Sequence, residues 1–451
     1  MRIAFYSSNP NKYDFQSDER TRFPTFFSEW EVILRRFSEY EFFVISQLPS
    51  PFLLDLHDGI VSPLPSKVNF KISSALTPAD FAKDVLAFKI DIAIAASFWL
   101  PPFDWHCLFD SEVAEILRIN GVKTLSHPST TSFLCFDKYQ TRLFLEKNDF
   151  SVPRAVFVDH RLYWAERGKK EINVNVYKNY ILRQIQDLRF PVVIKDTAGL
   201  SSYGMEVAVS FAQALDYLNS GRTNSDRIVE EYKNGVHFGT EIFAENGNYY
   251  VLPPLVFSLN KFGITSPKQS VKLGTVNLTD FDYFKLNSML IRLSKLLNFS
   301  GIAQVDLVFC NGEWHIIEIN PRLSGMTETN AALLNKSVLE ILLELALGIF
   351  EFSLENFTKN YVCNLKLPLL SDSKLKSLYE QKNVALVRRT QNPSAKQERE
   401  KGFCEMILKA TSPQELLEQL IFFKTNFSEC MEDAFVETAK RMLKEFFPTV
   451  I

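Results

Sequence analysis

Short apolar runs alternate with longer segments of mixed polarity through the first 125 residues of the chain. The apolar runs lie at residues 3–8, 42–46, 90–97 and 122–128. Such spacing is typical of βαβ units, in which helices cover the faces of a parallel sheet. We therefore predict a Rossmann-like parallel-sheet domain over residues 1–125, although the dinucleotide pattern GxGxxG is absent from the chain.

The segment from residue 126 to residue 350 combines helical and strand patterns. Residues 137–147 (DKYQTRLFLEK) have the periodicity of a helix. Three runs have strand character: 191–195, 205–209 and 227–235. Residues 160–190 are charged and irregular, which favours an insertion or a mobile connection. The helix pattern at 137–147 ends before a turn-like segment, which indicates a domain junction there.

The last hundred residues, 351–451, change character again. Residues 361–390 have strand character, and residues 412–427 (SPQELLEQLIFFKTNF) form an amphipathic pattern that begins at a capping serine. This part of the chain predicts a small C-terminal α+β domain.

Residues 301–326 contain the most informative polar pattern of the chain. Two strand-like runs flank Asn311 and Gly312, whose residue types favour a tight turn. Because side chains alternate between the two faces of a strand, apolar residues share one face of this predicted hairpin. The other face collects four polar side chains: Gln304, Asp306, Glu318 and Asn320.

The length of the turn decides where these polar side chains point, because a shift of one residue turns every side chain to the other face. A three-residue loop of Cys310, Asn311 and Gly312 would keep Asp306 and Glu318 together as diagonal neighbours, about 7 Å apart. A two-residue turn would separate them. The three-residue loop is favoured because it places the apolar side chains of both strands on one face. Two carboxylates about 7 Å apart suit magnesium bound to a nucleotide. An exposed polar face is the alternative interpretation.

A Gly- and Ser-rich loop follows the strand that ends at Lys195. Its residues of interest are Gly199, Ser201, Ser202 and Gly204. Backbone N–H groups of such a loop can surround phosphate oxygens, while a lysine at the strand end supplies a positive charge. The P-loop pattern GxxxxGK[ST] is absent, so a hairpin without a ligand is the alternative.

Composition narrows the class of protein. The chain has 451 residues, 46% of them hydrophobic and 23% charged, and a formal net charge of −3. This balance disfavours nucleic-acid binding, and no apolar run approaches the ~18 residues of a membrane span. Six scattered cysteines indicate neither a zinc site nor a redox pair. We therefore expect a cytoplasmic protein that binds neither nucleic acid nor membrane.

The order of these motifs resembles the ATP-grasp superfamily of carboxylate–amine ligases over about residues 1–350. The order is DKxxTRxxLE, the lysine with its Gly/Ser loop, VEEY, QVDLVF and IIEINPRLSG. The resemblance implies a preATP-grasp parallel-sheet domain at 1–125 and a two-lobed ATP-grasp domain at 126–350 with a mobile lobe at about 191–232. A C-terminal domain, here 351–451, is also seen in the branch that includes L-amino-acid ligases and carbamoyl-phosphate-synthetase-like enzymes.

The resemblance also implies which residues bind the nucleotide phosphates. Lys138 and Lys195 would contact the phosphates, and the loop at 199–204 would close over them. Arg322 would lie near the transferred phosphate, so that Arg322 and Lys195 are the candidate catalytic residues.

The remaining motif residues match the adenine, ribose and metal sites of the family. Glu230, Glu231 and Tyr232 match the hinge whose backbone holds adenine. Asp306, Glu318 and Asn320 match the magnesium ligands. His237 stands where the family often has a ribose-binding acid, and a histidine can also bond a ribose hydroxyl. Gln304 replaces the arginine of some D-alanine–D-alanine ligases, which makes that subfamily a poorer match.

The implied reaction is ATP-dependent ligation, with ATP and Mg²⁺ as cofactors, two metal ions bound and Mn²⁺ as an alternative metal. ATP phosphorylates a carboxylate, and an amine then displaces phosphate from the acylphosphate. We expect a small acid and a small amine as partners, with an amino acid or peptide-like compound among them, and leave a homodimer open.

Two other functions remain alternatives: a ligase of nucleotide or cofactor biosynthesis, and a catalytically silent ATP-binding module. Substrate contacts are expected from three segments: 10–24, 260–275 and 322–330.

Overall fold

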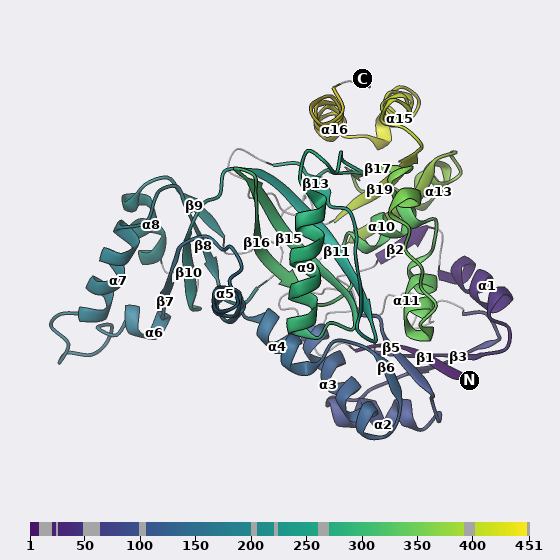
Figure 1. Cartoon of the computed structure of the whole chain (residues 1–451), viewed down its shortest axis with the longest axis horizontal. Helices are drawn as coiled ribbons and strands as arrows, with labels where there is room; N and C mark the ends of the chain where they lie inside the picture. Colours follow the sequence, from purple (N-terminus) through teal and green to yellow (C-terminus); the bar gives the residue numbers. More distant parts are fainter. Residues whose placement is uncertain are drawn as a thin grey trace.

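The computed structural model describes residues 1–8, 20–23, 26–47, 64–98, 105–199, 205–220, 224–259, 270–391 and 402–448. Within these ranges the strands form three sheets. Figure 1 shows a parallel sheet near the N-terminus, a separate lobe that contains β7–β10, and a large central sheet between that lobe and the C-terminal helices.

The N-terminal sheet has five parallel strands in the order β4–β3–β1–β5–β6. Its strands are β1 (Arg2–Ser7), β3 (Glu41–Ser46), β4 (Val68–Ile72), β5 (Ile92–Ala95) and β6 (Lys123–Leu125). The accompanying helices are α1 (Phe26–Arg36), α2 (Pro78–Leu86) and α3 (Trp105–Ile119). Phe5 packs against Trp30 and its neighbour Tyr6 against Phe81, so both faces of β1 are buried, as a parallel sheet requires. The predicted parallel sheet is confirmed.

The second sheet has four antiparallel strands in the order β7–β10–β8–β9. They are β7 (Ala155–Val158), β8 (Val192–Asp196), β9 (Glu206–Ala208) and β10 (Arg227–Glu231). The helices of this lobe are α6 (His160–Tyr163), α7 (Val176–Gln186) and α8 (Phe211–Asn219).

Helix α7 corrects the expectation that residues 160–190 are irregular. Asn175 caps its N-terminus by accepting a hydrogen bond from the Lys178 N–H. Ile181 and Ile185, four residues apart on one face, are buried in the core of this lobe. Only these two residues of the helix are buried, so the apolar face is narrow and the sequence signal for a helix is weak.

The largest sheet has ten strands. Nine of them follow the order β16–β15–β11–β13–β14–β17–β19–β18–β2. The tenth, β12 (Asn248–Val251), pairs with β11 (Val236–Glu245). The others are β2 (Arg20–Phe23), β13 (Leu255–Phe257), β14 (Lys272–Gly274), β15 (Gly301–Cys310), β16 (Glu313–Asn320), β17 (Tyr361–Leu367), β18 (Val384–Gln391) and β19 (Gly402–Ala410). Antiparallel pairing of β14 with β17 joins the C-terminal strands to the rest of the sheet. Segments far apart in sequence thereby become neighbours along one sheet.

Helices surround this sheet: α4 (Ser129–Phe136), α5 (Lys138–Lys147), α9 (Tyr283–Leu297), α10 (Thr327–Leu334), α11 (Val338–Leu347), α12 (Leu354–Thr358), α13 (Asp372–Tyr379), α15 (Pro413–Asn426), the 3₁₀ turn η2 (Ser428–Cys430) and α16 (Asp433–Phe446). Ser412 caps α15, which confirms the predicted amphipathic helix. Leu290 of α9, Leu365 of β17 and Leu420 of α15 belong to one buried cluster. The C-terminal segment therefore shares its core with the central sheet.

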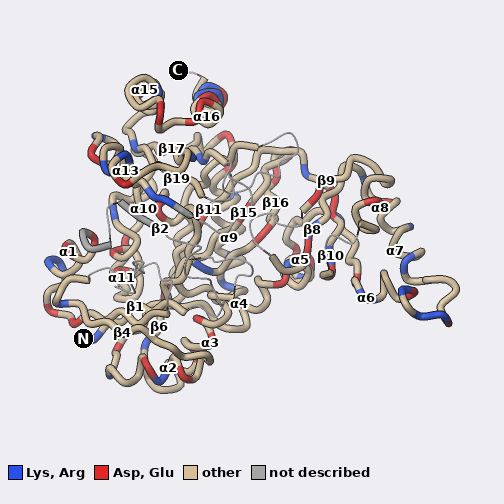
Figure 2. The backbone as a smooth tube through the Cα atoms, turned by 180° about the vertical axis from the view of Figure 1, so that it is seen from behind, with Lys and Arg blue, Asp and Glu red and all other residues tan. Residues whose placement is uncertain are grey.

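Charged residues of both signs are interspersed along the described backbone, as Figure 2 shows. No helix within the described ranges is long and apolar enough to cross a membrane.

Candidate functional site

The hairpin of β15 and β16 turns differently from the sequence prediction. Asn311 and Gly312 have φ values of 53° and 75° and form a two-residue turn between Cys310 and Glu313. Positive φ at both central residues is the reason why Asn-Gly is favoured at this place. The predicted three-residue loop is therefore wrong.

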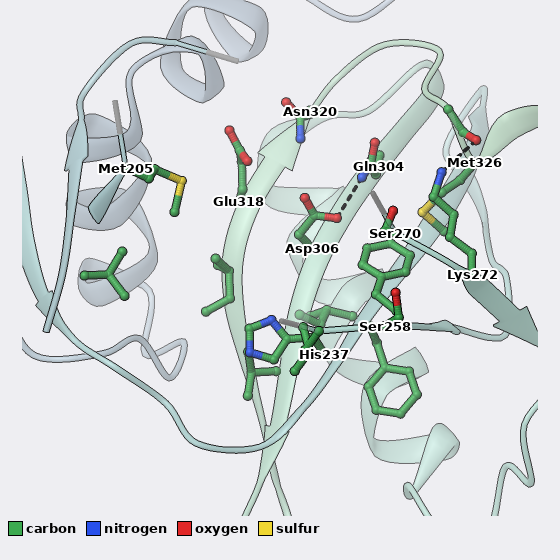
Figure 3. A pocket seen from close by; sticks show the side chains of 18 of the residues that line it. Met205, His237, Ser258, Ser270, Lys272, Gln304, Asp306, Glu318, Asn320 and Met326 are labelled. Atoms are coloured by element: carbon green, nitrogen blue, oxygen red, sulfur yellow. Dashed lines mark hydrogen bonds between the residues drawn. The ribbon is translucent and has the colours of Figure 1, made fainter. Parts of the chain in front are cut away.

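A β-bulge in β16 nevertheless brings the polar side chains to one side. Leu307 pairs with Ile316, whereas its neighbour Asp306 pairs with Glu318, so that Ile317 is the extra residue. With a two-residue turn alone, Asp306 and Glu318 would lie on opposite faces of the hairpin. The extra residue shifts the following part of β16 by one position and returns Glu318 to the face that carries Asp306. Asp306 and Glu318 are thus direct cross-strand partners rather than diagonal neighbours. Figure 3 shows both carboxylates among the side chains that line a cavity.

The two carboxylates differ in their electrostatic surroundings. Burial, and next the negative charge of Glu318, raise the pKa of Asp306 to about 7. Burial also opposes ionisation of Glu318, but the positive charges of Lys138, Lys195 and Arg322 hold its pKa below the usual value. Asp306 accepts a 2.7 Å hydrogen bond from Gln304 Nε2. Additional positive charge between the carboxylates would therefore favour ionisation of both.

The two predicted phosphate lysines approach from different elements. Asp137 caps α5, and the next residue, Lys138, places its Nζ 2.9 Å from Glu318 Oε1 and 2.8 Å from the Gly199 carbonyl oxygen. Lys195 of β8 donates a 2.6 Å hydrogen bond to Glu230 Oε1 of β10, and both side chains are buried. Lys138 thus connects the hairpin to the loop that follows β8. Ser201, Ser202 and Gly204 of that loop lie outside the described residues.

The side chains of the predicted adenine hinge have structural partners. Glu230 binds Lys195, and Glu231 accepts a 3.0 Å hydrogen bond from the Arg189 N–H. The Tyr232 N–H donates to the Pro191 carbonyl oxygen at 2.9 Å. These contacts hold the end of β10 in place, and Lys233, the next residue, also lines the cavity.

His237 lies beside this hinge, with its ring 6.4 Å from that of Tyr232. Burial lowers the pKa of His237 to about 4, so the imidazole is neutral at pH 7. Its Nε2 is buried and has no hydrogen-bond partner among the described residues. A polar atom in this state is suited to bonding a ligand hydroxyl.

One cavity of about 250 Å³ contains most of the predicted site. At the hinge end it is lined by Val193, Met205, Glu230, Glu231, Tyr232, Lys233 and His237. The middle is lined by Gln304, Asp306, Glu318, Asn320 and Arg322. Beyond them lie Lys272, Lys366, Arg388, Phe403 and Glu405. Lys138 and Lys195 line an adjoining small cavity together with Glu230 and Glu318, both of which also line the large one.

The hairpin residues fit a magnesium ion that is shared with a nucleotide. Over the described ranges, no group of three or more His, Cys, Asp and Glu side chains could hold a metal ion. Asp306 and Glu318 supply two carboxylates, and Asn320 Oδ1, which accepts a 3.1 Å hydrogen bond from Arg322, supplies an amide oxygen. Magnesium bound to a nucleotide needs only one or two carboxylates, because phosphate oxygens and water complete its shell.

One known family matches the part of the chain that contains most of these residues. The family described as the ATP-grasp domain matches residues 135–326, from the end of α4 to the segment after β16. The match covers 192 of the 451 residues of the chain. The resemblance inferred from the motifs is confirmed, and the matched residues include Lys138, Lys195 and the acidic hairpin.

The first curated relatives that the chain matches are larger proteins. The arginine-specific carbamoyl phosphate synthase large chain of Geobacillus stearothermophilus is 26% identical over 176 residues, which are 36% of this chain and 17% of that protein. The chain spans about a quarter or less of the length of the first curated relatives that it matches.

Two solved structures share the fold over most of the chain. An L-amino acid ligase from Bacillus licheniformis superposes with a TM-score of 0.61 at 16% identity, covering 92% of this chain and 94% of that one. The second is the biotin carboxylase domain of Hydrogenobacter thermophilus 2-oxoglutarate carboxylase, solved with MgADP, ADP and bicarbonate. It superposes with a TM-score of 0.58 at 11% identity, covering 93% of this chain and 88% of that one. At such identities the likeness concerns the fold, and the predicted fold class is confirmed.

Several residues around the ATP-grasp domain were not predicted individually. Lys272 lies within the segment 260–275 that was expected to contact substrate, whereas Lys366, Arg388 and Glu405 come from the C-terminal strands. Charged residues inside apolar strands, as in NLKLPL and FCEMILK, were the available signal. Only the pairing of β14, β17, β19 and β18 shows that they meet.

Glu241 of β11 was also missed. It is fully buried and accepts hydrogen bonds from Ser324 Oγ, Thr327 Oγ1 and Asn330 Nδ2 at 2.8, 2.6 and 2.8 Å. These donors belong to the segment that follows Arg322. Glu241 is therefore a positioning residue for one wall of the cavity.

Proposed function

We propose that the protein is an ATP-dependent carboxylate–amine ligase, which activates a carboxylate as an acylphosphate and releases ADP and phosphate. The supporting observation is the cavity that runs from the hinge of β10 to the facing pair Asp306 and Glu318. Lys138 forms an ion pair with Glu318, so an ammonium group lies beside the two carboxylates.

The chain's own residues would act mainly by position and charge. Phosphoryl transfer depends on orienting the reacting groups and on neutralising charge around the transferred phosphoryl group. We assign this role to Lys138, Lys195 and Arg322, because all three lower the pKa of Glu318 and hence lie around the hairpin. Asp306, Glu318 and Asn320 would hold magnesium, which when bound neutralises phosphate charge as a Lewis acid.

The hinge end of the cavity would hold the nucleoside. The backbone after Glu230 and Glu231 would face adenine, because their side chains and the Tyr232 N–H are engaged within the protein. His237 would bond a ribose hydroxyl through its buried Nε2. The Gly/Ser loop with Gly199 would cover the phosphates, and the lobe at about 191–232 would move with it.

We further propose that an amino acid or a peptide-like compound is among the substrates. The L-amino acid ligase from Bacillus licheniformis shares the fold over 92% of this chain, which is the basis for this choice. The division into domains at 1–125, 126–350 and 351–451 belongs to the same proposal.

The experiment that tests this function is phosphate release from MgATP with amino acids offered singly and in pairs. We expect release that depends on both a carboxylate and an amine, and that stops when EDTA removes the metal. Binding of ADP without phosphate release for any compound would contradict the ligase and favour a nucleotide-binding module. Absence of ADP binding would contradict the nucleotide site itself.

A further inference from the structure

Three cationic side chains meet at the end of the cavity beyond Asp306. Lys272 lies on β14, Lys366 on β17 and Arg388 on β18, strands that the central sheet brings into one neighbourhood. Lys272 and Lys366 are only 6% and 3% exposed. Such deep burial of ammonium groups requires compensation by negative charge or hydrogen bonds.

Two of the three cations have carboxylate partners. Lys366 Nζ binds Glu405 and also donates a 3.1 Å hydrogen bond to Asn364 Oδ1. Arg388 Nη1 lies 2.7 Å from Glu328 Oε2, and its Nη2 binds Glu405. Two carboxylates thus balance Lys366 and Arg388.

Lys272 is compensated differently. Its Nζ donates a 3.0 Å hydrogen bond to the Gly325 carbonyl oxygen, and no carboxylate of the described residues lies within 4 Å of it. A Cβ atom at Gly325 would stand 3.4 Å from this Nζ, so glycine leaves room for the ammonium group. Figure 3 shows Lys272 among the lining side chains, with Ser258 and Ser270 nearby. Glu405, Asp306 and Glu241 act on Lys272 only from a longer distance, so this ammonium group has a main-chain hydrogen bond but no carboxylate in direct contact.

We propose that Lys272 binds a carboxylate of a substrate, one that is not activated in the reaction, at the far end of the cavity. This inference rests on the proposed ligase function and names its substrate class. A single ammonium group without a directly paired carboxylate matches one carboxylate of a ligand, whereas a phosphate ester carries nearly two charges at pH 7. The aromatic rings of Phe257 and Phe403 beside the lysines make this end less hydrated, which strengthens a charge-assisted hydrogen bond.

The carboxylate has two chemical sources: a second carboxylate of the acid, or the carboxylate of an amino acid that supplies the amine. Matched ligand pairs distinguish them. Succinate against its monomethyl ester represents the acid, and L-alanine against L-alaninamide represents the amine. We would measure the Kd of each compound by calorimetry with the full chain saturated with ADP and magnesium.

The variants for this experiment change one charge at a time. Lys272→Met removes the charge at similar volume, and Lys272→Arg keeps it. Lys123→Met is the matched control, because Lys123 Nζ also donates to a main-chain carbonyl, that of Ala346, but does not line the cavity. We expect the wild type and Lys123→Met to prefer the carboxylate form of at least one pair by about tenfold or more. Lys272→Met should reduce this preference to about twofold or less, and Lys272→Arg should restore part of it.

Other outcomes would overturn the inference in different ways. Equal affinity of the wild type for the carboxylate and uncharged forms of both pairs would show that the far end does not select a carboxylate. Loss of ADP affinity in Lys272→Met would make Lys272 a nucleotide contact instead. In either case ADP still binds to the wild type, so failure of this inference is distinct from failure of the nucleotide site.

Discussion

Asp306 and Glu318 face each other across the β15–β16 hairpin because the bulge at Ile317 offsets the two-residue turn at Asn311 and Gly312. Without that one extra residue, the two carboxylates would point to opposite faces of the sheet. The acidic pair is therefore produced by a local irregularity of the strand and not by its regular alternation.

Removal of either carboxylate should abolish turnover without unfolding the protein. We expect Asp306→Asn and Glu318→Gln to lower phosphate release from MgATP by at least about a hundredfold, because the charge that would hold magnesium is lost. Asp306→Asn should leave the Tm unchanged or higher, since burial and Glu318 already oppose ionisation of Asp306. Phosphate release near the wild-type rate by a folded Glu318→Gln protein would refute the metal assignment.

The buried pair of Lys195 and Glu230 allows stability to be separated from nucleotide binding. Lys195→Met should destabilise the protein by about 3–5 kcal/mol, because Glu230 is left buried without its cation. The double variant Lys195→Met/Glu230→Leu should regain most of this stability in urea unfolding.

Both proteins should nevertheless lose ADP affinity by more than about tenfold in calorimetry, because a charge-assisted contact with phosphate is removed. A stable double variant that binds ADP as tightly as the wild type would show that Lys195 is structural only.

A ribose contact by His237 can be tested with nucleotide analogues. We expect 2′-deoxy-ATP or 3′-deoxy-ATP to bind about two- to tenfold more weakly than ATP, since one hydrogen bond is lost. His237→Phe should bind ATP and the deoxy analogue equally. A preference for ATP that persists in His237→Phe would assign the ribose to another residue.

The pH dependence of stability should report the buried His127. Burial lowers its pKa to about 4, and its Nε2 lies 3.0 Å from the Ile302 carbonyl oxygen. The unfolded state takes up the proton near pH 6.5, so this histidine stabilises the fold fully above that pH. As the pH falls from 6.5 to 4, about 3 kcal/mol of this contribution is lost.

Other groups titrate over the same range, so a variant has to isolate His127. Protonation of His237, whose pKa is also lowered, destabilises the fold over the same range. Asp110 and Asp306 have pKa values raised to about 7, so their protonation on acidification stabilises the fold. The stability of His127→Gln relative to wild type should therefore rise by up to about 3 kcal/mol between pH 6.5 and 4 in urea unfolding. A difference that is constant with pH would contradict the lowered pKa.

Glu241 should affect catalysis through the segment that it holds. Glu241→Gln replaces an acceptor of three hydrogen bonds, which should destabilise the protein by about 1–3 kcal/mol. We also expect kcat to fall while ADP affinity is kept, because Arg322 and Gly325 lie next to the donors.

Glu344→Gln is the matched control for Glu241→Gln. Glu344 is a buried carboxylate that pairs with Arg36 and Lys336 away from the cavity. Its loss should lower the Tm but leave kcat unchanged below the melting range. Equal kcat values for Glu241→Gln and Glu344→Gln would contradict the positioning role of Glu241.

The sequence by itself determined many of the elements and supplied the candidate nucleotide residues. Apolar runs of strand length predicted the parallel sheet, and the order of Lys138, Lys195 and the acidic hairpin indicated the ATP-grasp domain. These signals are local, because strand alternation, helix capping and turn residue types act over a few neighbouring positions.

Tertiary structure alone decided which distant charges share the cavity. The bulge at Ile317 placed Asp306 opposite Glu318, and pairing of β14 with β17 joined Lys272 to a C-terminal cluster that contains Lys366 and Arg388. Such contacts depend on register and on pairing between distant strands, as for Lys272 of β14 and Asn364 of β17, which pair although they lie 92 residues apart in the chain. Residue type and spacing carry no record of that pairing, so the lack of a directly paired carboxylate at Lys272 becomes visible only in the folded molecule.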